Sequence, residues 1–331
     1  MKLSLIICTY KRSESLLRLL ESVKQQSHLP DEILVIDASP DKETALALKN
    51  THLAQLRYHK VEPEQRGLTK QRNTGIELCN PNTDIVSFLD DDTVLKPEYF
   101  KNLIKVFKDH PQITGVGGIA VNENQWQKTI IDEKDRNHIF KDGYRVKLST
   151  RYKLRQKLGL MSDLAPGQMP KFSHGNTQSY PLTGKTYQVD LLLGMSMAYR
   201  SKVVFNQKFS EYFEGYGLYE DADYSIRALK FGQNVIASSV QLEHHHHASG
   251  RPNQFTYGKM VVRNGWYVWR LRWPEPGFKN VVKWHANVLL LAFLRLGNTI
   301  TTRKKKQAFT EALGRFTALF LLCFKKPDIN R

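Results

Sequence analysis

The sequence predicts an α/β fold in which helices cover both faces of a mostly parallel β-sheet. Short apolar runs typical of strands occur at residues 3–8, 32–37 and 85–89. Segments with a helical pattern lie between them, at residues 15–26 and 70–78. Strands that alternate with helices in this way form βαβ units, whose strands run parallel.

The run at residues 3–8 is too short for the apolar core of a signal peptide, and no small-residue cleavage site follows it. We therefore expect it to be the first strand. The following helix and second strand complete a βαβ opening, which ends at a polar turn at residues 40–41. A further strand is expected at residues 56–61, and a short buried helix separates it from the strand at residues 85–89.

Two later stretches depart from this alternation. Residues 122–187 are rich in polar residues, Gly and Pro, so we expect a long excursion that borders the functional site. After residue 251 the chain changes to Trp, Tyr, Arg and Lys between apolar runs. Arg295, Glu311 and Arg315 interrupt these runs, which favours amphipathic helices over helices that span a bilayer.

We accordingly predict a catalytic domain over residues 1–250 and a helical extension over residues 251–331. The basic, aromatic-rich composition of the extension suits the surface of an anionic membrane. The alternative is that its helices simply pack on the catalytic domain.

The net charge of +17 calls for an anionic partner. Nucleic acid, an acidic membrane face and phosphorylated small molecules all qualify. The sequence has no zinc-ligand spacing, recognition-helix signature or aromatic RNA-binding motif, so we predict no nucleic-acid binding. Cys8, Cys79 and Cys323 lie far apart, which favours a reducing compartment. We predict a cytoplasmic protein, peripheral on the cytoplasmic face of the membrane.

Three consecutive carboxylates, Asp90, Asp91 and Asp92, end an apolar strand in the segment FLDDD. Their negative charges repel one another, so a positive charge nearby is needed to stabilise them. A divalent cation supplies this positive charge, because Mg²⁺ and Mn²⁺ prefer carboxylate oxygens together with the oxygens of a bound diphosphate. An acidic turn that caps a helix before Pro97 is the alternative for an isolated run of this kind.

Thr9, Asp37 and Asp90 each follow a predicted strand. Ligands of open parallel sheets gather beyond the carboxyl ends of the strands, so these side chains are expected to converge on one crevice. Asp37 at a strand end is otherwise an ordinary turn residue.

A second acidic cluster, Glu220, Asp221 and Asp223, precedes a helical pattern at residues 224–231. Acidic residues at a helix start are often only dipole partners or caps. Here the glycines within residues 215–217 let the backbone approach a ligand closely. A carboxylate at a helix N-terminus can also stay ionised as a base, so the two acidic clusters together favour catalysis.

Six motifs resemble, in order, those of family 2 glycosyltransferases with the GT-A fold: CTYKRSESL, VIDAS, RGLTKQRNTGIE, FLDDD, GMSMAYR and GYGLYEDADYSIRALKFG. Each motif alone is weak, whereas all six in family order are specific. The resemblance implies an inverting enzyme that moves a sugar from a nucleotide-sugar donor to a hydroxyl of a glycan or lipid-linked acceptor. UDP is the first expectation for the nucleotide, with dTDP and GDP open. Within residues 1–250 it implies a nucleotide-binding half, residues 1–120, and an acceptor-binding half, residues 121–250, to which the excursion at residues 122–187 would contribute. The sugar and the linkage are not identified.

The resemblance also implies a set of donor-binding residues. Asp37 would accept a hydrogen bond from the base edge, and the planar fork of Arg72 suits base or phosphate oxygens. Gly194 would let the backbone pass beneath the donor sugar. Asp91 can point elsewhere than its neighbours, because adjacent residues of a strand face opposite ways. The donor-binding residues implied are Thr9, Tyr10, Arg12, Asp37, Arg72, Asp90, Asp91 and Gly194.

By the same resemblance, Asp221 is the general base, and Glu220 positions the acceptor or orients Asp221. The metal ligands implied are Asp92, Asp90 and histidines of the run at residues 244–247, and the cofactor is Mn²⁺ or Mg²⁺. His244 comes first, and an extended chain alternates sides, which makes His246 its companion. A solvated histidine cluster is the alternative.

The sequence departs from the family pattern at Ala38, Lys70 and Gln71, which affects base selectivity more than reaction type. One rival is a sugar-1-phosphate nucleotidyltransferase, but its glycine-rich phosphate loop after the first strand is missing here. Another is a catalytically silent, membrane-associated nucleotide-binding protein, against which the intact acidic residues argue.

Overall fold

The computed structural model describes residues 1–130, 135–177, 179–246 and 252–329. The chain divides into two compact units. The first, here called the sheet unit, comprises Met1–Trp126 and Ser179–Ser249. The second, here called the helical unit, comprises Gln127–Gln178 and Gly250–Arg331.

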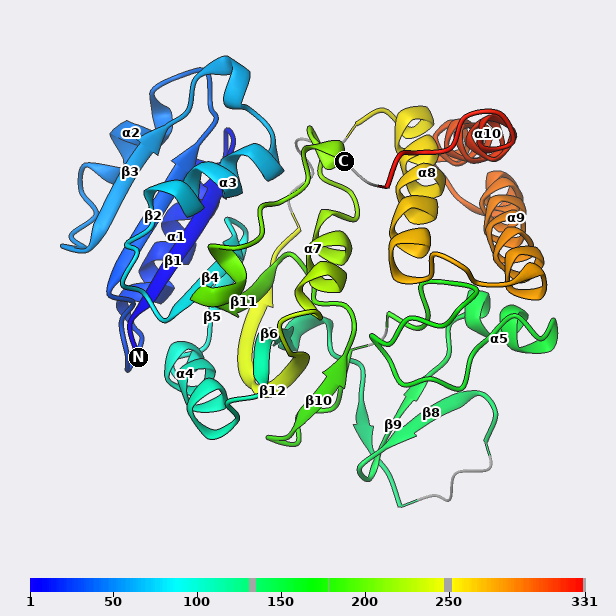
Figure 1. Cartoon of the computed structure of the whole chain (residues 1–331), viewed down its shortest axis with the longest axis horizontal. Coiled ribbons are helices and arrows are strands. Elements are labelled where there is room, and N and C mark those ends of the chain that lie inside the picture. The colour runs from blue at the N-terminus through cyan, green and yellow to red at the C-terminus, as the bar shows by residue number, and fades with distance from the viewer. Residues whose placement is uncertain (131–134, 178, 247–251, 330–331) are drawn as a thin grey trace. The chain divides into compact units, whose positions relative to one another are not determined.

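The sheet unit is built on a 9-stranded sheet with the order β10-β12-β6-β11-β4-β1-β2-β3, while β5 pairs with β12 (Figure 1). Strands β5, β10 and β11 run opposite to the other six, so the sheet is mostly parallel, as predicted. The strands are β1 (Leu3–Thr9), β2 (Glu32–Asp37), β3 (Leu56–Lys60), β4 (Ile85–Asp90), β5 (Thr93–Leu95), β6 (Ile113–Ala120), β10 (Thr186–Val189), β11 (Ser196–Arg200) and β12 (Gln233–His244).

Helices cover both faces of this sheet. Apolar side chains of α1, α2 and α4 pack on one face and form one core, while side chains of α3, α6 and α7 contribute to a second core on the other. The helices are α1 (Ser13–Lys24), α2 (Glu43–Leu48), α3 (Leu68–Leu78), α4 (Tyr99–Asp109), α6 (Ser201–Val204) and α7 (Glu220–Ala228). Short 3₁₀ turns lie at η1 (Pro63–Gln65), η2 (Val121–Glu123) and η3 (Glu211–Phe213).

The local pattern of the sequence explains these elements. Strand β2 is buried at every position, as expected of a continuous apolar run in a sheet covered on both sides. In α1 the buried leucines Leu16, Leu19 and Leu20 recur at helical spacing and face the sheet. Burying a leucine side chain stabilises the fold by about 1.5–3 kcal/mol.

The register of the parallel strands aligns their carboxyl ends. Thr9 pairs with Asp37 between β1 and β2, and Cys8 pairs with Asp90 between β1 and β4. The residues that the sequence places after separate strands therefore lie at one edge of the sheet, where α/β proteins bind their ligands.

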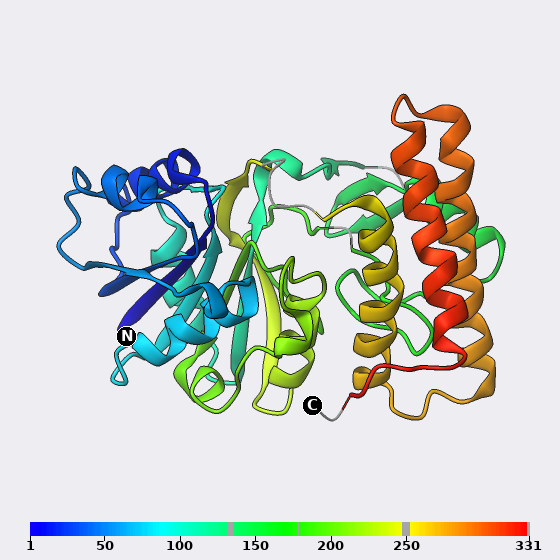
Figure 2. The same cartoon turned by 90° about the horizontal axis from the view of Figure 1, so that it is seen from above.

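In its described residues, the helical unit contains a small antiparallel sheet in the order β7-β9-β8 and four helices. Figure 2 shows α8, α9 and α10 side by side. None of the helices in the described part of the chain is long and apolar enough to cross a membrane. The elements are β7 (Gln127–Lys128), β8 (His138–Lys141), β9 (Tyr144–Lys147), α5 (Thr150–Lys157), α8 (Gln254–Arg272), α9 (Phe278–Thr301) and α10 (Lys305–Leu322).

Residues 127–178 group with the C-terminal helices, whereas the sequence analysis assigns them to the acceptor-binding half. The expected excursion also carries short strands and a helix, which its weak periodicity did not reveal. The functional division of residues 1–250 and 251–331 stays a prediction.

Candidate active site

Arg72 of α3 lies at the centre of the candidate site and is only 2% exposed. Its Nη1 lies 2.5 Å from Glu220 Oε1 at the start of α7. Its Nη2 donates a hydrogen bond of 3.2 Å to the carbonyl of Gly194 and lies 3.4 Å from Asp90 Oδ1. The two acidic clusters of the sequence therefore meet at one guanidinium.

The carboxylate of Asp221 is held by two backbone N–H groups. The N–H of Gly194 donates to Oδ2 over 3.0 Å, and that of Ala222 donates to Oδ1 over 2.8 Å. A Cβ at position 194 would lie 3.0 Å from Glu220 Oε1 and 3.3 Å from Arg72 Nη2. A side chain at position 194 would therefore crowd both charged groups, which glycine avoids where the chain passes them before β11.

Burial raises the pKa of Glu220, although the adjacent guanidinium of Arg72 opposes that rise. Burial of the carboxylate likewise raises the pKa of Asp221, while the N–H groups of Gly194 and Ala222 lower it. Glu220 is enclosed, whereas Asp221 is partly exposed. Of the two carboxylates, Asp221 is the one that can meet a ligand and accept its proton.

Asp91 is buried and points inward. It accepts hydrogen bonds from Thr9 Oγ1 over 2.7 Å and from Arg12 Nη1 over 3.1 Å. Burial raises the pKa of Asp91 to about 6, and both partners limit the rise. Arg12 also lies 3.6 Å from Asp92 Oδ2. In this structure Asp91 orients Thr9 and Arg12, and contact of these three residues with a donor stays a prediction.

Asp37, at the end of β2, is fully buried. Its carboxylate accepts hydrogen bonds from the Ser39 N–H over 2.8 Å and from the Tyr58 hydroxyl over 2.9 Å. Asp37 therefore fixes the chain after β2, and its hydrogen bond to a base stays a prediction. Tyr10, which directly follows β1, is 43% exposed and leaves its ring open to a ligand.

Asp90, Asp92 and His244 form a group whose ligand atoms all lie within 4.8 Å of one another. His244 ends β12, and its Nε2 lies 3.3 Å from Asp92 Oδ1. Burial lowers the pKa of His244, but the neighbouring carboxylates outweigh this effect and the pKa is raised. Two carboxylates and an imidazole form a donor set that suits Mn²⁺, and the carboxylates also suit Mg²⁺.

His246 faces a different carboxylate. Its Nε2 lies 3.0 Å from Glu123 Oε1, and its ring centroid lies 4.1 Å from that of His244. The same Glu123 oxygen lies 3.1 Å from His244 Nδ1. Glu123 thus contacts His244 through the nitrogen opposite the one that faces Asp92. Such a carboxylate fixes the tautomer and orientation of a metal-binding imidazole. Whether His246 binds metal stays a prediction, and His247 lies outside the described residues.

Sequence reasoning missed the parts played by Glu123 and Gln71. Gln71 Nε2 donates to the carbonyls of Thr9 over 3.1 Å and Ile36 over 2.8 Å, so it ties the end of β1 to the end of β2. The sequence analysis treated Gln71 only as a departure from the family pattern. The sequence did carry a signal for this role: a long amide side chain takes the place of a small residue, close after two predicted strands. Nothing near Glu123 in the sequence indicates that it contacts β12.

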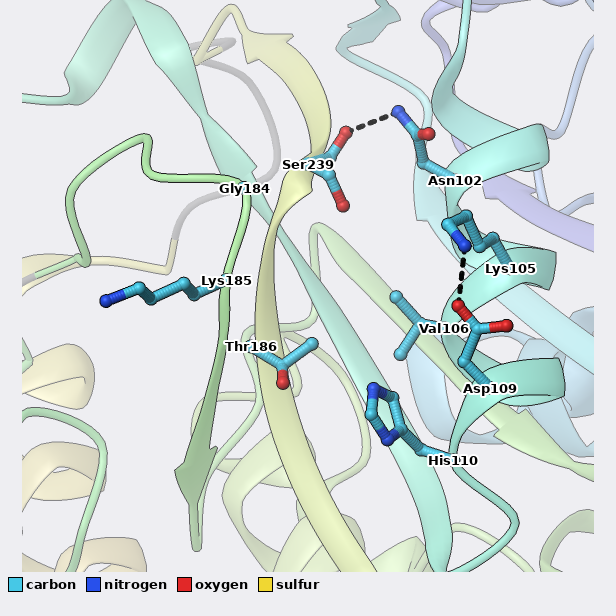
Figure 3. Close-up of a pocket in the computed structure, with 9 residues that line it drawn as sticks. All are labelled: Asn102, Lys105, Val106, Asp109, His110, Gly184, Lys185, Thr186 and Ser239. Atoms are coloured by element: carbon cyan, nitrogen blue, oxygen red, sulfur yellow. Dashed lines mark hydrogen bonds and ion pairs between the residues drawn. The ribbon is translucent and has the colours of Figure 1, made fainter.

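A separate hollow on the sheet unit has none of the predicted site residues in its lining (Figure 3). It lies beside α4, β10 and β12. Two of its charged groups pair with each other, because Lys105 Nζ lies 2.7 Å from Asp109 Oδ2, while Lys185 lies apart from them. Asn102 donates to the carbonyl of Ser239 over 2.8 Å. The hollow is therefore separate from the acidic clusters that the sequence singles out.

The sequence matches the model of the family described as "Glycosyl transferase family 2" over residues 4–169. This match covers the motifs at the ends of β1, β2 and β4. The chain belongs to glycosyl transferase family 2.

Curated proteins of the same kind align with part of this glycosyltransferase. The glucosyl-dolichyl phosphate glucuronosyltransferase of Haloferax volcanii is 30% identical over 124 residues, which cover 37% of this chain and 39% of the relative. The amylovoran biosynthesis glycosyltransferase AmsE of Erwinia amylovora is 33% identical over 124 residues, covering 36% of this chain and 45% of the relative. The chain thus matches less than half the length of either relative.

Solved structures support the fold at low sequence identity. The mannosyltransferase PcManGT from Pyrobaculum calidifontis, in complex with GDP-Man and Mn²⁺, has a TM-score of 0.54 at 12% identity and matches 98% of this chain and 88% of its own. S. aureus TarS 1-349, in complex with UDP-GlcNAc, has a TM-score of 0.50 at 16% identity, with coverage of 96% and 80%. The predicted GT-A fold of this family member is confirmed.

Proposed function

We propose that the chain transfers a sugar from a nucleotide-diphosphate donor to an acceptor hydroxyl with inversion at the anomeric carbon. The observation that carries this proposal is the contact of Arg72 with both Asp90 and Glu220. Through Arg72, the carboxylate of Asp90, which is suited to bind a cation, is linked to the start of α7, where Asp221 is accessible. A donor site and a proton acceptor side by side are what a single displacement requires.

The donor side rests on Asp90, Asp92 and His244. Their oxygens and imidazole, within 4.8 Å of one another, fit Mn²⁺ or Mg²⁺. When bound, such an ion neutralises the charge that grows on the leaving diphosphate. Arg12 lies 3.6 Å from Asp92 and adds a positive charge at the same edge of the sheet.

The acceptor side rests on Asp221. Its carboxylate, oriented by the N–H groups of Gly194 and Ala222, takes the proton from the acceptor hydroxyl as that oxygen attacks the anomeric carbon. Attack on the face opposite the diphosphate inverts the configuration. Arg72 balances the charge of Glu220 and keeps this second carboxylate from repelling the first.

The nucleotide and the acceptor are the finer parts of the proposal. PcManGT is described with GDP-Man and TarS with UDP-GlcNAc, which supports a nucleotide-sugar donor, and we expect UDP first. The names of the relatives mention glucosyl-dolichyl phosphate and amylovoran biosynthesis, and we propose a lipid-linked or glycan acceptor for this chain. A peripheral position at the cytoplasmic face of a membrane belongs to the same proposal.

The test is a screen of UDP-, dTDP- and GDP-sugars with Mn²⁺ or Mg²⁺, in which the released nucleoside diphosphate is measured. We expect release that requires the cation and increases with the right acceptor, and an NMR spectrum of the product that shows the inverted anomer. Release of pyrophosphate from a nucleoside triphosphate and a sugar phosphate would instead identify a nucleotidyltransferase. A product that retains the donor's configuration would overturn the role given to Asp221.

A further inference from the structure

One face of α9 carries a row of exposed apolar side chains. They recur at intervals of four and seven residues, which places them on one side of a helix. Each is between 40% and 85% exposed, although large apolar side chains in soluble proteins are mostly buried. The residues of this row are Phe278, Val282, Leu289, Phe293 and Ile300.

Helix α10 and the residues directly after it repeat the pattern. Their exposed row has the same spacing of four, seven and four residues. Phe293 of the first row contacts α10, because its ring centroid lies 5.2 Å from that of the partly buried Phe316, and Figure 2 shows α9 and α10 side by side. The residues of the second row are Phe309, Leu313, Phe320 and Phe324. Together the two rows are called the apolar face.

The charges around the apolar face are almost entirely positive. Exposed basic side chains lie in the link between the two helices, in the first turn of α10 and in the segment after α10, which also carries the exposed Asp328. The basic residues are Arg303, Lys304, Lys305, Lys306, Lys325 and Lys326. The sequences of α9 and α10 contain one acidic residue, Glu311. It is buried and lies 2.7 Å from Arg295 and 2.6 Å from Arg315, so its charge is balanced inside the unit.

We propose that the apolar face of α9 and α10 docks flat on an anionic lipid bilayer. Its aromatic and aliphatic side chains would enter the boundary between headgroups and acyl chains, and its basic residues would bind lipid phosphates. A helix of 24 residues, such as α9, offers a long flat contact of this kind. The inference rests on the membrane part of the proposed function and is independent of sugar transfer.

Charge complementarity selects the bilayer over a second copy of the chain. A second copy would bring its own basic residues to the same face, and like charges oppose that contact. An anionic bilayer offers both an apolar layer and negative phosphates. The geometry is that of a helix lying in the interface, since no helix in the described ranges could cross a membrane.

The experiment uses the full chain and vesicles of phosphatidylcholine with or without phosphatidylglycerol, and binding is measured by cosedimentation. We expect at least tenfold tighter binding to the anionic vesicles, and an affinity that falls as salt is raised. Equal binding to both kinds of vesicle, or none to either, would overturn the proposal.

Two double variants separate the contributions of the apolar and the basic residues to vesicle binding. Phe293→Ser with Phe320→Ser should weaken binding to anionic vesicles by tenfold or more, because two exposed rings no longer enter the lipid. Lys304→Glu with Lys305→Glu should weaken it to a similar extent. The matched charge control is Lys49→Glu with Lys108→Glu, which makes the same charge change at exposed positions of the sheet unit. Equal loss in that control would show mere dependence on net charge and refute docking through this face.

Cys323 provides a second readout. It is exposed next to Phe324, whereas Cys79 is buried and Cys8 is partly so, so a thiol-reactive, polarity-sensitive dye labels it selectively. Its emission should shift to the blue on anionic vesicles. If the protein bound vesicles while the dye stayed in water, the contact would lie elsewhere and the proposal would be overturned. It would also be overturned if light scattering showed that the unmodified chain is a dimer and that Phe293→Ser with Phe320→Ser dissociates it. Nucleoside diphosphate release without vesicles should be unchanged in these variants, which separates this inference from the proposed sugar transfer.

Discussion

Asp221 is held so that its carboxylate keeps its orientation without a charged neighbour on either oxygen. Backbone N–H groups of Gly194 and Ala222 bind one oxygen each, and the nearest cation in the cluster, Arg72, is engaged by Glu220. Burial raises the pKa of Asp221, which makes it a stronger base than an exposed aspartate. Asp221 is therefore both held in a fixed orientation and more basic than an exposed aspartate.

Replacing this carboxylate tests that assignment. Asp221→Asn should lower kcat by roughly 10²–10⁴-fold, because the amide cannot accept a proton from the acceptor hydroxyl. Donor affinity should change little, since the groups proposed to bind the donor are left in place. Steady-state kinetics and calorimetric titration of the donor measure the two quantities.

The matched control is Asp223→Asn in the same helix. Asp223 is fully buried and pairs with Arg227 over 2.5 Å. Its replacement should lower the melting temperature and leave most of the turnover per folded molecule. If both variants lost turnover equally, a general distortion of α7 would explain the result and the role of Asp221 would fall.

Glu123 is argued to act through His244. Glu123→Gln should weaken Mn²⁺ binding roughly tenfold, because the imidazole loses the carboxylate that fixes its tautomer. Mn²⁺ affinity can be measured by calorimetry without any donor. His246→Gln is the informative companion, since His246 Nε2 contacts the same Glu123 oxygen as His244 Nδ1. A larger loss in His246→Gln than in His244→Gln would show that the wrong imidazole has been placed beside the metal.

At the scale of elements, helices α8 and α10 touch backbone to backbone. A Cβ at Gly258 in α8 would lie 2.1 Å from the carbonyl oxygen of Glu311, and one at Gly314 in α10 would lie 2.1 Å from that of Phe255. Neither contact leaves room for a methyl group. The two glycines therefore set the distance between these helices.

Gly314→Ala should lower the free energy of unfolding of the helical unit by about 1–3 kcal/mol, because the helices must move apart. The control is Gly297→Ala in α9, where a Cβ would meet no atom within 4 Å. That change should be neutral or slightly stabilising, since Ala favours a helix over Gly. Urea unfolding followed by circular dichroism compares the two, and equal stabilities would contradict the close contact.

Some features of the fold and of the site could be predicted from the sequence, and others could not. The apolar runs and the motifs after β1, β2 and β4 predicted the parallel sheet and its ligand edge, because both depend on local patterns. The contact of Arg72 with Glu220 was not predictable in this way. It depends on β11 lying beside β4, with antiparallel pairing, and on the chain before β11 passing Arg72. Contacts of that kind are set by strand order, which periodicity does not determine.

The contact of Glu123 with His244 has the same origin. Strand β12 pairs with β6 in parallel, which brings the end of β12 beside the turn that follows β6. The backbone N–H of His244 donates to Asn122 Oδ1 over 3.0 Å and fixes that arrangement. The sequence indicated a histidine ligand, but only the packing of two distant strands shows which carboxylate supports it.

At the scale of the whole molecule, the tryptophans are divided unevenly between the two units. Of the 5 tryptophans, Trp126 belongs to the sheet unit, and the others belong to the helical unit. Their emission therefore reports mainly on unfolding of the helical unit. The remaining tryptophans are Trp266, Trp269, Trp273 and Trp284.

The helical unit also contains His174, whose ring nitrogen Nε2 lies 3.0 Å from the position of a Cβ at Gly265. Burial lowers the pKa of His174 from 6.5 to about 4, and the positive charge of Arg155 adds to that effect. The unfolded chain therefore takes up a proton near pH 6.5, whereas the folded unit resists protonation until about pH 4. Stability from this residue is complete above pH 6.5 and is lost as the pH falls through that window.

We expect the urea midpoint reported by tryptophan emission to decrease between pH 6.5 and pH 4. The associated loss of free energy of unfolding is on the order of 2 kcal/mol, because a depressed histidine pKa favours the protonated unfolded state. In His174→Gln this contribution disappears, so the midpoint should depend less steeply on pH even if its value at pH 7 is lower. An unchanged slope in the variant would show that other groups carry the pH dependence, because a neutral glutamine cannot take up the proton that His174 accepts on unfolding.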